Sequence, residues 1–192
     1  MEARENLGDH IVVDMQYGSA QTANVVLGGR GGVGGPRGNR YFATGNGGRQ
    51  ALAHRRPSTL LRRLIDEPGF SNSQQIIEVP GRAPTTVREL FVHFTTIVEG
   101  HVPTFHGYWG FISDAKQGPD GEIWLNTTQS WRDFSVLISA DLAARFVARF
   151  NVHDLEDLAG AYVLVFEHLS KSQGGKLYVA LTELDTISVY QP

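Results

Sequence analysis

Apolar positions near the N-terminus form short runs rather than long periodic stretches. Residues 10–17 and 22–27 each hold several adjacent apolar side chains, and the polar, glycine-containing residues 18–21 separate them. This pattern predicts two short strands joined by a turn. Ten glycines then lie between residues 25 and 49, a density that favours a loop over a helix or strand.

Apolar residues at helical spacing predict two helices in the next part of the chain. The first covers residues 58–65, with Ser58 as the expected N-cap. The second begins near Thr86, which has capping-box spacing to Glu89. Its buried face is expected to contain Val87, Leu90, Phe91, Phe94, Ile97 and Val98.

From residue 106 onward, short apolar runs alternate with turn residues. Asp141 is the expected N-cap of a helix over residues 142–150. Strands are expected at 107–113, 122–128, 133–139, 161–169 and 176–190. The pattern as a whole predicts a mainly β fold with helices, of the α+β class. It also predicts an N-terminal region, residues 1–104, followed by a strand-rich domain, residues 105–192.

The order of three strands, a helix and two strands in residues 105–190 resembles the OB-fold, a five-stranded Greek-key barrel. Four stretches carry the resemblance: the hairpin-like 110–126, the third-strand-like 133–138, the fourth-strand approach 155–166 and the closing 174–190, with Ile187 and Val189. Another small β-barrel or an α+β domain is the alternative.

The resemblance implies a surface for single-stranded nucleic acid on the second and third strands and on the loops 113–121 and 169–176. Strand alternation predicts that Trp124 points outward between Ile123 and Leu125, and that Tyr178 points outward in the last part of the fold. Exposed aromatic rings stack bases, and cations contact phosphates. The candidate residues here are Lys116, Trp124, Trp131, Arg132, Lys171, Lys176 and Tyr178. Ordinary packing is the alternative role of each aromatic.

Charge is divided unevenly along the 192 residues, although the formal net charge is only −3. Residues 15–65 contain eight arginines and no acid, whereas residues 66–192 contain sixteen acids and eight bases. Such asymmetry favours a basic segment for an anionic partner. Mutual neutralisation of the two parts within the protein is the alternative.

The glycine-rich stretch contains the spacing GxGxxG at Gly29, Gly31 and Gly34. A dinucleotide site also needs a following helix and an acid about 20 residues later, but glycines and a proline follow here, and the next acid is Asp66. An RGG-like arm fits better, because arginines contact phosphates and aromatics stack on bases. Its candidate residues are Arg30, Arg37, Arg40, Tyr41 and Arg49. A plain linker is the alternative.

Catalytic chemistry has little support in the sequence. The chain has no cysteine, which excludes disulfides and thiolate chemistry, and no nucleophile or zinc-hydrolase motif is present. His93, His101 and His106 lie close in sequence, but the first falls on an expected helix and the others in a loop. We expect no enzyme activity, no catalytic residue, no metal and no cofactor.

These observations together predict a single-stranded nucleic-acid-binding protein, with DNA favoured over RNA. The alternative is a protein-interaction module or assembly subunit, a homo-oligomer included, whose basic segment docks on an acidic surface.

The acidic first ten residues do not resemble a secretory signal, and no apolar run reaches the roughly 20 residues of a membrane span. We therefore expect no membrane association and an intracellular, cytoplasmic location.

Overall fold

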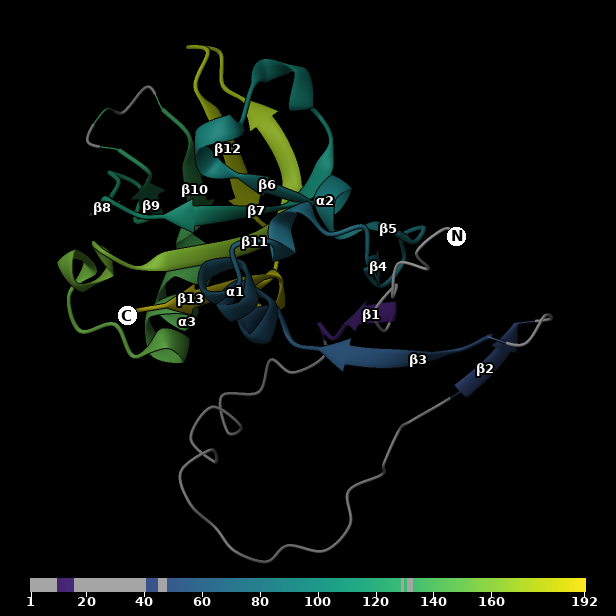
Figure 1. Ribbon diagram of the computed structural model, residues 1–192. Helices are drawn as coiled ribbons and strands as arrows, with labels where there is room; N and C mark the ends of the chain where they lie inside the picture. Colours follow the sequence, from purple (N-terminus) through teal and green to yellow (C-terminus); the bar gives the residue numbers. More distant parts are fainter. Residues whose placement is uncertain (1–9, 16–40, 45–47, 129, 131–132) are drawn as a thin grey trace, which may run out of the picture.

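The computed structural model contains both helices and strands and confirms the predicted α+β class (Figure 1). The structure describes residues 10–15, 41–44, 48–128, 130 and 133–192, with the backbone alone for 41–44 and 48–52. The expected strand at 22–27 and the GxGxxG glycines lie outside these residues. No helix among the described residues is long and apolar enough to cross a lipid bilayer.

Among the described residues, the first sheet has five strands in the order β2-β3-β1-β4-β5. β1 lies between β3 and β4 and is parallel to both, while β2 and β5 pair antiparallel with β3 and β4. Part of the glycine–arginine stretch therefore forms strands rather than a loop. The bounds are β1 (His10–Val13), β2 (Tyr41–Thr44), β3 (Gly48–Arg55), β4 (Ile76–Glu78) and β5 (Thr85–Thr86).

Helix α1 (Pro57–Asp66) begins one residue earlier than the sequence pattern predicts. Its N-cap is Arg56, so the prediction of Ser58 as N-cap is wrong. The physical reason is Pro57, whose fixed φ suits the first helical position and whose missing N–H needs no partner there. The predicted leucine face is buried, with Leu60 and Leu61 inaccessible to solvent.

The second expected helix is much shorter than predicted. Thr86 and Glu89 form the predicted capping box, but α2 (Val87–Leu90) is a single turn. Phe91 begins β6 (Phe91–His93), which pairs parallel with β7 and places Phe91 beside Gly107. Pairing with a neighbouring strand thus replaces the helical hydrogen bonds after the first turn.

The second sheet contains eight strands. Its hydrogen-bonded order is β6-β7-β11-β12-β10-β9-β8, and β13 pairs with β11. β7 and β8 stand at different places in this order but are separated in sequence only by Ile112 and Ser113. The bounds are β7 (Phe105–Phe111), β8 (Asp114–Gln117), β9 (Ile123–Asn126), β10 (Ser135–Ile138), β11 (Tyr162–Lys171), β12 (Leu177–Leu181) and β13 (Ile187–Tyr190).

Helix α3 (Ala140–Phe150) connects β10 to β11 at the expected place. Its N-cap is Ser139 rather than Asp141, which lies in the first turn. The prediction of Asp141 as cap is therefore wrong, although a carboxylate there still complements the helix dipole. The helix ends at Phe150, and its C-cap Asn151 has a left-handed φ of 51°. Its apolar face, which includes Leu142 and Phe146, is buried.

Strand β11 separates two hydrophobic clusters. Val163 and Val165 belong to the larger one, with α3, β9, β10 and β12. Leu164 and Phe166 belong to the other, with α1 and the first sheet. A strand that is buried on both faces needs a nearly continuous apolar run, which explains the sequence of this strand. Figure 1 shows β11 beside β7 and β13, with α1 close to it.

Candidate nucleic-acid interface

Four of the predicted residues lie near one another on one side of the sheet formed by β8, β9, β10 and β12. They are Lys116, Trp124, Lys176 and Tyr178. Ile123 and Leu125 are buried below this side, and Trp124 is half-buried, as strand alternation predicts. Leu137 on the central strand pairs with Trp124 on one side and with Ala180 on the other. We call this surface, formed by Lys116, Trp124, Leu137, Lys176, Tyr178 and Ala180, the outer face.

Two aromatic rings and one ammonium meet on the outer face. The ring centroids of Trp124 and Tyr178 are 6.1 Å apart, and their planes are inclined at 62°. The Nζ of Lys176 lies 4.6 Å from the centre of the Trp124 ring. This distance is within the range of a cation–π interaction. A ring that can stack on a base and a cation that can contact phosphate are therefore adjacent.

The turn before β12 holds Lys176 in this position. Its backbone N–H donates to the Oγ of Ser172 at 3.0 Å, and its carbonyl accepts from the N–H of Ser172 at 2.9 Å. Gly175 closes the turn with a φ of +85°, a conformation that glycine adopts without strain. Burial lowers the pKa of Lys176, and the charge of Asp133 partly opposes this shift.

Acidic side chains offset the positive charge of this surface. The indole N–H of Trp124 donates to Oε1 of Glu122 at 3.1 Å, and this hydrogen bond is the main cause of the lowered pKa of Glu122. Lys116, on the edge strand β8, pairs with Asp114 at 3.0 Å. The outer face therefore presents aromatic surface with little net positive charge. The sequence pattern alone did not reveal Leu137 as part of this face or Glu122 as the hydrogen-bond acceptor of Trp124.

Lys171 does not join this group. It ends β11, and its Nζ pairs with Oε1 of Glu99 at 2.6 Å. In the register of β11 and β12, Lys171 lies opposite Leu177, whereas Tyr178 lies opposite Ser170. Since neighbouring positions on a strand face opposite sides, Lys171 and Tyr178 do not share a face. Lys171 serves the contact with Glu99 instead.

The remaining predicted residues have no described side chain. Arg30, Arg37, Arg40, Trp131 and Arg132 lie outside the described residues. Tyr41 and Arg49 lie in the hairpin of β2 and β3, where the backbone alone is described. Their roles stay predictions.

Of the three neighbouring histidines, His101 and His106 lie near each other, whereas His93 contacts a different ring. His93 lies on β6 and meets the ring of Trp109 edge-on, with centroids 4.6 Å apart. His101 and His106 have ring centroids 5.9 Å apart. The Nδ1 of His106 is 3.1 Å from the carbonyl oxygen of Glu89. Within the described part of the chain, no three His, Asp or Glu side chains are grouped as metal ligands.

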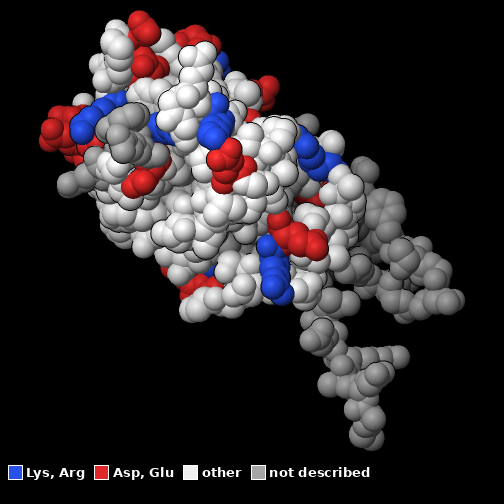
Figure 2. Space-filling view, turned by 90° about the horizontal axis from the view of Figure 1, so that it is seen from above, with Lys and Arg blue, Asp and Glu red and all other residues white. Residues whose placement is uncertain are grey.

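Surface charge is mixed on the face seen from above Figure 1. In Figure 2, small groups of basic and acidic side chains alternate over this face, and the described residues form no broad basic area on it. Phosphate contacts normally supply much of the affinity for nucleic acid. The described part of this face therefore lacks the charge pattern of a strong phosphate-binding surface.

Comparison with known proteins adds no further constraint. Neither a model of a known protein family nor a curated protein sequence matches the chain. The assignment of function consequently depends on the residues and geometry described above.

Proposed function

We propose that this protein is a non-enzymatic single-stranded nucleic-acid-binding protein, with DNA favoured over RNA, whose outer face stacks bases. The contact of Trp124 with both Tyr178 and Lys176 is the observation that carries the proposal. Base stacking on aromatic rings tolerates any sequence, and adjacent cations hold the backbone. In this proposal, most of the phosphate contacts come from the acid-free arginine segment, residues 15–65.

An OB-like barrel is the fold that we propose for residues 105–192. Its support is the set of strand pairings: β10 is parallel to β12, while β9–β10, β11–β12 and β7–β11 are antiparallel. β8 is the last strand of this path and β7 is the second, next to β6, and only Ile112 and Ser113 separate β7 from β8 in sequence. If β7 and β8 act as one bent strand, the order matches the Greek-key order of that barrel.

Binding of labelled oligonucleotides to the full chain tests the function. We expect fluorescence anisotropy to detect binding of oligo-dT, and more weakly of oligo-rU, at low salt. Trp124→Ala should weaken binding about tenfold, because a stacked base contributes about 1–3 kcal/mol. Phe111→Ala is the matched control, since this aromatic is exposed on β7 and does not belong to the outer face. Absence of binding to both oligonucleotides at low salt would overturn the proposal.

The arginine segment has its own test. Replacing Arg30, Arg37 and Arg40 together by glutamine should reduce the slope of log Kd against log salt by about 2, because each phosphate contact on a single strand contributes roughly 0.7. Trp124→Ala should leave this slope nearly unchanged. If the triple variant keeps the wild-type slope, the segment does not contact phosphates.

A protein-interaction module is the second candidate, and the charge division favours it. The basic residues 15–65 complement the excess of acids in residues 66–192, and opposite potentials promote association between molecules. In this case the measured mass should rise with protein concentration in the absence of nucleic acid. Sedimentation that gives one monomer mass at every concentration would exclude self-association.

A further inference from the structure

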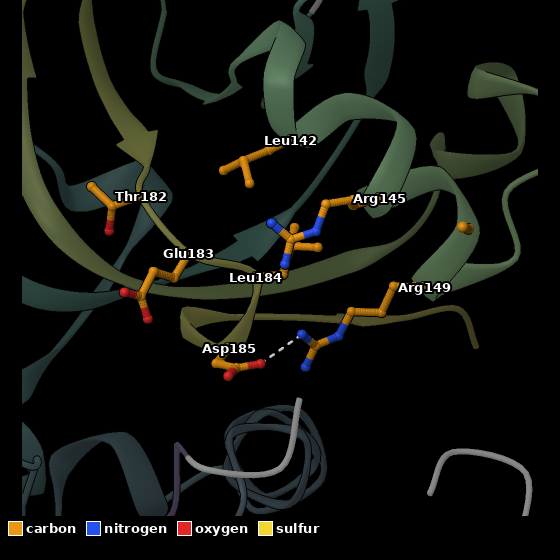
Figure 3. A pocket seen from close by; sticks show the side chains of 8 residues that line it. Leu142, Arg145, Arg149, Thr182, Glu183, Leu184 and Asp185 are labelled. Atoms are coloured by element: carbon orange, nitrogen blue, oxygen red, sulfur yellow. Dashed lines mark hydrogen bonds and ion pairs between the residues drawn. The ribbon is translucent and has the colours of Figure 1, made fainter. Parts of the chain in front are cut away.

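A groove lies between α3 and residues 182–185, the segment that follows β12 (Figure 3). Its volume is about 500 Å³. None of its residues belongs to the outer face, so its chemistry is independent of the function proposed above. Its lining consists of Leu142, Arg145, Ala148, Arg149, Thr182, Glu183, Leu184 and Asp185.

Two arginines from α3 give the groove its chemistry. Arg145 and Arg149 are four residues apart, which places both side chains on one face of the helix. Arg149 is fixed by Asp185, with Nη1 and Oδ1 2.7 Å apart and only 20% of the arginine side chain exposed. The guanidinium of Arg145 extends from the helix toward Leu184 (Figure 3). Within the described part of the chain, Arg145 has no hydrogen-bond or ion-pair partner.

The wall opposite α3 is held by a buried carboxylate. Glu167 on β11 is 7% exposed, and its Oε1 accepts from the backbone N–H of Thr182 at 3.0 Å. The hydroxyl of Thr182 donates to the same oxygen. The hydroxyl of Thr186 donates to the carbonyl of Glu183 at 2.9 Å and lies 3.4 Å from Oε1 of Glu167. Glu167 thus fixes the segment 182–186 at Thr182, and the bond from Thr186 to Glu183 closes its other end, so the groove has a preorganised wall. Preorganisation lowers the entropic cost of binding a ligand.

The composition of the groove selects one class of ligand. A guanidinium without a partner matches the planar geometry of a carboxylate, with two parallel N–H donors. Leu142 and Leu184 are almost fully buried and line the groove with a narrow strip of apolar surface for the group that carries it. Glu183 and Asp185 stand nearby and disfavour a dianion such as a phosphate monoester. We propose that this groove binds a carboxylate carried on an apolar group, with Arg145 as its direct partner and Arg149 as a second donor.

A small aliphatic acid and the C-terminus of a peptide share this chemistry, and two probes distinguish them. The full chain is titrated with butyrate and, separately, with an acetylated tripeptide of alanine and leucine that ends in a free carboxylate. Butyramide and the amidated tripeptide are the uncharged controls. Saturable NMR shifts at α3 and residues 182–185 are expected with an acid form and not with its amide. Whichever acid saturates identifies the source of the carboxylate.

Variants test the role of Arg145. Arg145→Gln should weaken binding of the acid about tenfold, because a charge-assisted hydrogen bond is stronger than a neutral one. Arg88→Gln, which removes an exposed arginine on α2, is the matched control and should bind as the wild type does. Equal binding by acid and amide, tighter binding of inorganic phosphate, absence of saturation with both acids, or unchanged binding by Arg145→Gln would each overturn the proposal. Trp124→Ala should leave this binding unchanged, which separates it from the outer face.

Discussion

Lys176 lies over the ring of Trp124, with Nζ 4.6 Å from the ring centre. The two residues are 52 positions apart in sequence. They come together because β10 pairs with β9, which carries Trp124, on one side and with β12, which Lys176 precedes, on the other. Because Lys176 is half-buried, its ammonium is partly desolvated, and cation–π attraction is stronger when water is excluded. The pair is therefore the centre of the proposed outer face.

Replacing Lys176 distinguishes the contribution of its charge to oligonucleotide binding from the contribution of base stacking on Trp124. We expect Lys176→Gln to reduce the salt slope of oligonucleotide binding by about 0.7, the value for one phosphate contact on a single strand. Lys171→Gln is the matched control, because Lys171 pairs with Glu99 and does not share a face with Tyr178. An equal loss of slope in both variants would show that position on the outer face does not matter.

Glu167 is expected to contribute strongly to stability. Glu167→Ala leaves the N–H and hydroxyl of Thr182 without their acceptor in a partly buried place. Loss of such an acceptor typically costs about 1–3 kcal/mol, and urea unfolding measures the difference. Glu183→Gln, an exposed change in the neighbouring segment, should alter the free energy of unfolding by less than about 0.5 kcal/mol. Comparable effects of the two variants would contradict the structural role of Glu167.

Gly107 is required for the packing of two phenylalanines. A Cβ at this position would lie 2.6 Å from Cδ1 of Phe91 and 3.1 Å from Cε1 of Phe166. Both rings are buried, so Gly107→Ala should lower the free energy of unfolding by about 1–3 kcal/mol through overpacking. Gly69→Ala is the control, because a Cβ there meets no atom within 4 Å. Thermal unfolding of both variants checks this expectation.

Two histidines should make stability depend on pH. Burial lowers the pKa of His93, and burial is also the main cause of the lowered pKa of His106. The unfolded chain therefore takes up protons first as pH falls through about 6.5, which lowers the free energy of unfolding there. This contribution to stability is fully present above about pH 6.5 and is lost below it.

The variant His106→Asn isolates one of these groups. Its free energy of unfolding should fall less than that of the wild type between about pH 7.5 and about pH 5.5, as measured by urea titrations at each pH. Parallel pH profiles for the two proteins would show that His106 does not contribute.

Local features were predictable where neighbours in sequence decide the structure. The capping box of Thr86 and Glu89, the alternation around Trp124 and the α+β class follow from side-chain type and spacing over a few residues. Errors occurred where a local preference competed with another contact. Ser58 and Asp141 were plausible N-caps, but the observed N-caps, Arg56 and Ser139, each lie two residues earlier, before Pro57 and directly after β10.

Tertiary structure decided the features that depend on pairing between distant strands. Apolar spacing in residues 87–98 suits a helix, yet pairing of Phe91 with Gly107 turns the chain into β6. Lys171 and Lys176 lie in the same predicted loop, but the strand register places Lys171 next to Glu99 and Lys176 over the ring of Trp124. The groove residues Arg145 and Asp185 likewise come from separate elements. Sequence spacing describes contacts within one element, whereas register and packing determine which side chains of different elements meet.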